Sequence, residues 1–61
     1  MTNLTTKELS ALDDQIRHEQ VLVKKYHAMA CLCDETRVQT DLNGIADKHQ
    51  QHLNTLMGFL N

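Results

Sequence analysis

Three side chains able to bind a metal ion, Glu19, His49 and His52, occupy positions where a helical repeat requires apolar residues. Histidines three residues apart project from the same face of a helix, so His49 and His52 would act together. Imidazole suits zinc, copper, iron and nickel, and a carboxylate adds a harder oxygen ligand. The pattern therefore indicates either a metal site or a buried polar cluster, provided that the fold brings Glu19 to the histidines.

Two series of apolar residues predict the helices that would position these groups. Both series alternate steps of three and four residues, which is the spacing of the buried seam of a packed helix. The first consists of Leu9, Leu12, Ile16, Glu19, Val23, Tyr26, Ala30 and Cys33, and the second of Val38, Leu42, Ile45, His49, His52, Leu56 and Phe59. Each series is interrupted near its middle, by the glutamate in the first and by the histidines in the second.

The first predicted helix begins with a capping signal. Thr5 followed three residues later by Glu8 is the capping-box pattern, in which each residue binds the backbone N–H of the other. Leu4 and Leu9 flank this pair at the spacing of a hydrophobic staple. We therefore expect the helix to begin at Thr6.

The chain is expected to turn back near Asp34, although no proline or glycine marks the position. Continuing the first series past Cys33 leads to polar residues, whereas the apolar residues restart out of phase at Val38. Asp34 is of a residue type that commonly caps a helix N-terminus, which favours a second helix starting at the next residue. One uninterrupted long helix is the rival interpretation.

Length and composition favour a small all-α protein. The chain has 61 residues, no proline and two glycines, so we predict a single domain over residues 1–61. Its expected form is an antiparallel helical hairpin with helices over about 6–33 and about 35–60. Two helices alone cannot cover both apolar seams, so we expect a homodimer that forms a four-helix bundle. Gly44, inside the second helix, either permits close approach of another helix or is simply tolerated.

A turn near Asp34 would set Glu19 level with both histidines. The numbers of facing residues then add to about 69, so Glu19 faces the position between His49 and His52. An antiparallel two-fold dimer would bring two copies of this group into one core, sufficient for one crowded metal ion or two open ones. A metal-free hydrogen-bonded network is the alternative, because bundle cores retain polar residues that fix register. A third interpretation leaves all three side chains exposed.

The remaining composition limits the other classes of function. The net charge of −2 provides no basic patch for nucleic acid, and no apolar run is long enough to span a bilayer. The polar N-terminal segment is unlike a secretory signal, so we expect a cytoplasmic protein. No nucleophile–base pair or phosphate-binding loop is present, and we predict that the protein is not an enzyme.

The other potential ligands are expected to lie outside the metal group. Cys31 and Cys33 are two residues apart on a helix, point in different directions and cannot readily share a metal ion. They are interpreted as packed thiols or as a disulfide between subunits. His18 and His27 fall outside the seam and are predicted to be at the surface.

A resemblance to known proteins rests on two segments, DDQIRHEQVLVKKY over residues 13–26 and DKHQQHLNTL over residues 47–56. Together with their surroundings they resemble the small spore-coat-protein-F-like proteins of endospore-forming Firmicutes and, more distantly, half of a ferritin-like bundle. In ferritin-like carboxylate proteins the first helix contributes a glutamate and the second a Glu-x-x-His motif. Glu19 matches the first position and His52 the last, whereas His49 stands in place of the second glutamate.

The resemblance implies a ferritin-like four-helix bundle and a structural or assembly role in sporulation, with other spore coat proteins as partners. The implied location is the mother-cell cytoplasm or the spore coat. The alternative is a metal-binding ferritin-like module, with or without redox activity, that holds zinc, iron or manganese through Glu19, His49 and His52. Because His49 replaces a bridging carboxylate, the chain departs from the pattern needed for oxygen-activating chemistry. A third hypothesis is an adaptor hairpin whose partner is another helix.

Overall fold

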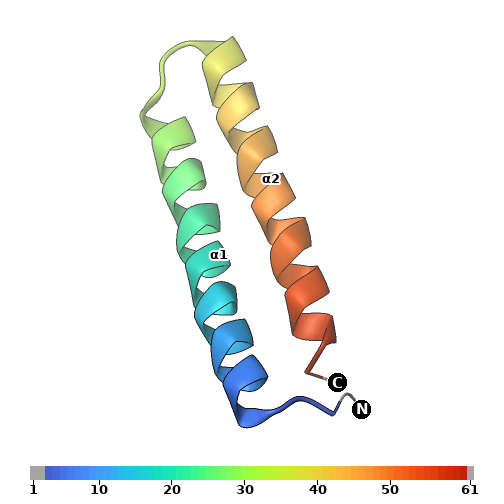
Figure 1. Cartoon of the computed structure of the whole chain (residues 1–61). Coiled ribbons are helices and arrows are strands. Elements are labelled where there is room, and N and C mark those ends of the chain that lie inside the picture. The colour runs from blue at the N-terminus through green and yellow to red at the C-terminus, as the bar shows by residue number, and fades with distance from the viewer. Residues whose placement is uncertain (1–2, 61) are drawn as a thin grey trace.

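The computed structural model describes residues 3–60, and within this range it contains two α-helices and no strand. Helix α1 spans Thr6–Leu32 and helix α2 spans Thr36–Gly58. The helices lie side by side in opposite directions, and the first and last described residues lie at the end opposite the connecting loop (Figure 1). The predicted all-helical hairpin is confirmed, and the interpretation as one long helix is wrong.

The capping box at the start of α1 is present as predicted. The Glu8 backbone N–H donates to Thr5 Oγ1 at 3.1 Å, and the Thr5 backbone N–H donates to Glu8 Oε1 at 3.1 Å. The Thr5 hydroxyl also donates to Glu8 Oε1, at 2.8 Å. Thr5 thus donates two hydrogen bonds to the Glu8 carboxylate, one from its backbone N–H and one from its hydroxyl. Both favour the ionised form, and they hold the pKa of Glu8 below its ordinary value, the backbone bond having the larger effect.

The loop between the helices is built differently from the prediction. Cys33 ends α1 in an extended conformation, and its backbone N–H donates to the Ala30 carbonyl at 3.2 Å. The N-cap of α2 is Glu35, also extended and without a side-chain capping bond, so the prediction of Asp34 as the cap is wrong. Extended residues at both ends of the loop let the chain cross from one helix to the other. They delay the start of α2 to Thr36.

The helix ends also differ slightly from the expected ranges. The first helix stops at Leu32 rather than at about residue 33, since Cys33 is already extended. The second stops at Gly58 rather than at about residue 60. There the backbone N–H groups of Phe59 and Leu60 donate to carbonyls three residues earlier, as in a tightened last turn.

Five residues form the most buried part of the described chain: Ile16, Glu19 and Ala30 on α1, and Ala46 and Leu53 on α2. Ala30 and Ala46 are 1% and 0% exposed, respectively. Ala30 lies near the loop end of α1 and Ala46 near the middle of α2, and their small side chains suit close contact between the helices. Glu19 is the one charged residue among the five, and its residue surface is 7% exposed.

The buried seam of α2 is rotated from the predicted one. Ala46 and Leu53 pack against α1, whereas Val38, Ile45, His52 and Phe59 remain exposed. A helix with one neighbour buries only a narrow stripe, and the apolar residues of α2 occupy a wider arc than α1 covers. The hairpin alone therefore leaves part of the second series exposed, in line with the expectation that two helices cannot cover both apolar seams.

Gly44 lies away from the contact between the helices. A Cβ atom added at this position would meet no heavy atom within 4 Å among the residues considered in the described part of the chain. The packing of the hairpin therefore does not require a glycine here. Of the two interpretations of Gly44, tolerance is the one that fits the hairpin.

Candidate metal centre

Glu19, His49 and His52 converge at the middle of the hairpin. Each offers a ligand atom, and the three atoms lie within 4.8 Å of one another. Glu19 is the central residue of α1, with thirteen helical residues on either side. The juxtaposition proposed from the sequence is thus observed, with both histidines supplied by the facing helix.

Two contacts toward the loop show the register that produces this juxtaposition. The Gln39 side-chain amide donates to the Ala30 carbonyl at 3.0 Å. Further from the loop, His27 Nδ1 lies 3.0 Å from Asn43 Oδ1. In both pairs the residue numbers add to about 69, as expected for antiparallel neighbours joined by a short loop. Extending the same register toward the middle places Glu19 between the two histidines.

The Glu19 carboxylate is the buried anchor of the group. Its Oε2 accepts a hydrogen bond from His49 Nδ1 at 2.7 Å, and its Oε1 accepts a longer one from the Gln15 amide at 3.4 Å. Removing an ionised carboxylate from water is costly unless a charge or hydrogen bonds compensate it. The two donors provide part of that compensation, and a cation at this position would provide more.

The group opens to solvent on the side of His52. The His52 side chain is 62% exposed, and its Nδ1 lies 3.9 Å from Glu19 Oε1, beyond hydrogen-bond distance. His49 is intermediate, with its side chain 22% exposed. Exposure thus rises from Glu19 through His49 to His52, so an ion held here would face protein on one side and an open approach on the other.

Aromatic packing fixes the orientation of His49. The Tyr26 ring is stacked on the His49 ring, with centroids 5.6 Å apart and planes 8° from parallel. The His52 ring meets His49 edge-on, at 5.7 Å and 87°. Two neighbouring rings therefore hold the plane of His49, and its Nδ1 lies 2.7 Å from the carboxylate.

Sequence reasoning did not assign Gln15 to the site, and it placed Tyr26 in the seam without predicting its stack on His49. Gln15 lies one helical turn before Glu19 and Tyr26 lies two turns after it, so both share its face. The signal was present in the spacing. A polar or aromatic residue at either distance from a buried carboxylate is placed to contact its partners.

The arrangement fits a transition-metal ion with limited adjustment. Two ligands on one ion at about 2.1 Å each lie no more than about 4.2 Å apart, somewhat less than the 4.8 Å span of the group. The exposed His52 side chain can close that difference by rotating. To ligate through Nδ1, His49 must give up the proton that it donates to Glu19, so the ion would replace that proton.

The other potential ligands lie apart from this group. Cys31 is exposed and Cys33 is half-buried, both near the loop, and both thiols are free. His27 is exposed and engages Asn43, and His18 is exposed, as predicted for both. The candidate centre therefore comprises Glu19, His49 and His52.

Within residues 3–60, neither helix combines the length and apolar character needed to cross a membrane. The chain was compared with protein-family models, with curated proteins and with solved structures. None of these comparisons found a match.

Proposed function

We propose that this protein binds a divalent transition-metal ion through Glu19, His49 and His52. The observation that carries the proposal is the convergence of three ligand-bearing side chains, from two helices, within 4.8 Å. A bound cation would neutralise the buried carboxylate, and it would link α1 to α2 at their middle. Two imidazoles and one carboxylate suit zinc and iron, and manganese is a further candidate because of the carboxylate.

The position of His52 favours a metal over a metal-free network. A network needs one donor for Glu19 Oε2, and His49 already supplies it at 2.7 Å. His52 makes no hydrogen bond to the carboxylate, at 3.9 Å, yet it is directed to the same group of atoms. A metal ion gives this second histidine a role that the network leaves unfilled.

The proposed role is binding rather than catalysis. Each hairpin supplies one carboxylate, and an imidazole cannot bridge two metal ions as a carboxylate does. We therefore propose a metal-stabilised structural module that is not an enzyme. Its ion would contribute to stability because it binds the folded pair of helices and not the unfolded chain.

Thermal melts of protein purified without a nickel column test this proposal. After treatment with chelator, added zinc, iron or manganese should raise the melting temperature of the wild type. Glu19→Leu should abolish the rise, because the variant lacks the buried anchor. His18→Ala is the matched control, since it removes an exposed histidine outside the group. A wild type that contains no metal and shows no shift with any of the three ions would refute metal binding.

A second candidate is a structural or assembly part, as the resemblance to spore-coat-protein-F-like proteins implies. The observation that favours it is the number of large apolar side chains left exposed on the hairpin, including Met29, Ile45 and Phe59. Such residues fit a protein that functions within an assembly. A tagged chain followed through sporulation should enter the spore coat or remain in the mother cell. Absence from sporulating cells would argue against this role.

A further inference from the structure

A row of exposed side chains, all apolar except His52, runs along one edge of the hairpin. On α2 the row consists of Val38, Ile45 and Phe59, with His52 between the last two. Successive members are seven residues apart, so they lie along one line of the helix. Since His52 approaches Glu19, the row borders α1 on the side of the metal group.

Helix α1 extends the same surface. Leu22, Tyr26 and Met29 follow Glu19 at steps of three and four residues, and Tyr26 stacks on His49. Leu22 and Tyr26 are half-buried and Met29 is exposed. We call the surface formed by Leu22, Tyr26, Met29, Val38, Ile45 and Phe59 the apolar face.

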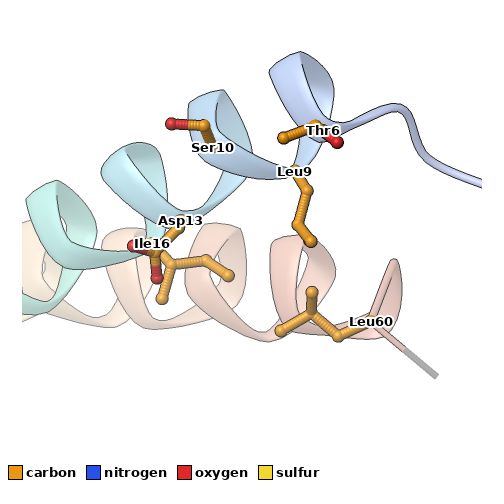
Figure 2. Close-up of a pocket in the computed structure, with 6 residues that line it drawn as sticks. All are labelled: Thr6, Leu9, Ser10, Asp13, Ile16 and Leu60. Atoms are coloured by element: carbon orange, nitrogen blue, oxygen red, sulfur yellow. The ribbon is translucent and has the colours of Figure 1, made fainter.

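The opposite edge of the hairpin has a different character. Its middle has the His27–Asn43 contact and a shallow depression in which Gln20, Lys24 and Gln50 surround the apolar side chains of Val23 and Leu53. At the open end, Leu9 and Leu60 point toward one another beside Ile16 in an open groove of about 460 Å³ (Figure 2). Leu9, Ile16, Gln20 and His27 are separated by seven, four and seven residues and so lie on the same side of α1. The groove therefore belongs to this edge and not to the apolar face.

The surface area indicates how much of the hairpin remains to be covered. The chain exposes 4842 Å². A compact folded chain of 7.0 kDa exposes roughly 4,000 Å², so the excess is about 800 Å². That excess is about the area that each partner buries in a stable protein–protein interface.

We infer that the apolar face binds a second copy of this chain and that the two copies hold the metal ion between them. The inference rests on the proposed metal-binding function. Glu19 lies at the centre of α1, and a two-fold axis that passes the hairpin at this level sets both Glu19 residues side by side. The exposed His52 of each copy then enters the interface, where it completes the coordination that one hairpin leaves open.

Charge explains why the ion and the pairing depend on each other. Face-to-face pairing buries two Glu19 carboxylates near one axis, and like charges in such a position repel. One divalent cation neutralises both carboxylates, and the two copies offer it six side chains. We therefore assign one divalent ion to each pair of chains. In this arrangement the four helices form one bundle around the ion.

Sedimentation equilibrium of the wild-type chain tests the inference directly, with zinc as the probe. In zinc the protein should sediment at about twice the 7.0 kDa of one chain, and chelator should lower that mass. Zinc bound to a species of single-chain mass would overturn the inference and leave the proposed function standing. A pair that persists unchanged in chelator would also overturn it. A chain that binds neither zinc nor iron nor manganese would refute the proposed function itself.

A matched pair of variants separates the interface from the ligands. Ile45→Glu places a charge on the apolar face, and Val21→Glu places the same charge on a residue that is 61% exposed and two positions beyond Glu19. Residues two apart lie on nearly opposite sides of a helix, so Val21 is outside the face. Ile45→Glu should give a single-chain mass and at least a tenfold loss of zinc affinity, whereas Val21→Glu should match the wild type.

An Ile45→Glu variant that has the mass of one chain and binds zinc as tightly as the wild type would overturn the inference that two chains share the ion. If circular dichroism shows that this variant does not fold, the wild type provides a second measurement. In saturating zinc, its melting temperature should rise with protein concentration, because two chains share each ion. A melting temperature independent of concentration would overturn the inference.

Discussion

The Glu19 carboxylate accepts a hydrogen bond from His49 Nδ1 across the hairpin at 2.7 Å, at the midpoint of α1. This contact is shorter than the two other side-chain hydrogen bonds that join the helices, from Gln39 and between His27 and Asn43, both at 3.0 Å. It is part-buried, as is the Gln39 bond, whereas the His27–Asn43 contact is exposed. The position that links the helices most closely is therefore polar, and its two partners belong to the proposed metal site.

Metal binding should weaken in acid, because protons compete with the ion for the imidazole nitrogens of His49 and His52. Zinc titrations monitored by calorimetry at several pH values would measure the dependence. His18→Ala should retain the same profile, since that residue is not a ligand. An affinity that stays constant from about pH 5 to pH 8 would contradict ligation by histidine.

Truncation of the buried apolar residues should lower the free energy of unfolding. Ile16→Ala and Leu53→Ala should each cost about 2–5 kcal/mol, the usual range for core truncation. Leu12 and Leu56 are half-buried, and their replacement by alanine should cost less. Val21→Ala, at an exposed position, should change stability by no more than about 0.5 kcal/mol. Chemical denaturation would measure the free energy of unfolding of each variant. A larger loss at Val21 than at Ile16 or Leu53 would contradict the assignment of the buried residues.

Gly44→Ala should stabilise the protein by about 0.5–1 kcal/mol, because alanine loses less backbone entropy in a helix interior. The added Cβ meets no heavy atom within 4 Å among the described residues considered, so no clash offsets the gain. Thermal melts of the variant and the wild type in zinc would measure the difference. A loss of stability would indicate that another chain approaches α2 closely at Gly44.

The start of α1 should loosen in acid. The capping bonds from Thr5 lower the pKa of Glu8 in the folded chain, so its contribution to stability is present above the unfolded pKa. That contribution is lost as the pH falls through the folded pKa. Nuclear magnetic resonance titration should show Glu8 ionising below the value of a free glutamate.

Two variants isolate the capping box from other acid effects. Glu8→Gln should reduce the dependence of the melting temperature on pH below about 5, because it removes the titrating group. Thr5→Ala should cost about 0.5–2 kcal/mol, since it removes the cap. An unchanged acid dependence in Glu8→Gln would show that the capping box does not contribute to it.

Local signals made the hairpin and its register predictable. Thr5 and Glu8 define a start that depends on residues three apart, and the phase shift after Cys33 locates the turn. The prediction of Asp34 as the N-cap was wrong because residue type alone does not show which loop residue occupies the capping position. In the structure the extended Glu35 occupies it. Register then followed from the turn, which is why the proximity of Glu19 to the histidines could be predicted.

The face that α2 presents to α1 could not be read from its apolar pattern. The series from Val38 to Phe59 spans two adjoining edges of the helix, and the sequence does not say which edge the first neighbour covers. Ala46 resolves the choice, since its small side chain permits close contact and is fully buried. Because α2 turns Ala46 and Leu53 toward α1, His52 is left exposed. The position of α1 against α2 is needed to see this, and the sequence of α2 alone does not give it.

A link at the midpoint of a hairpin 46 Å long also has a consequence for its internal motion. Helices fray from their ends, and Glu19 with His49 divides each helix into two short arms that open separately. Backbone amides near the link should therefore exchange with solvent most slowly, and exchange should quicken toward both the loop and the open end. An ion at the link would slow exchange most at the centre and least at the tips, so that the hairpin opens from both ends toward its middle.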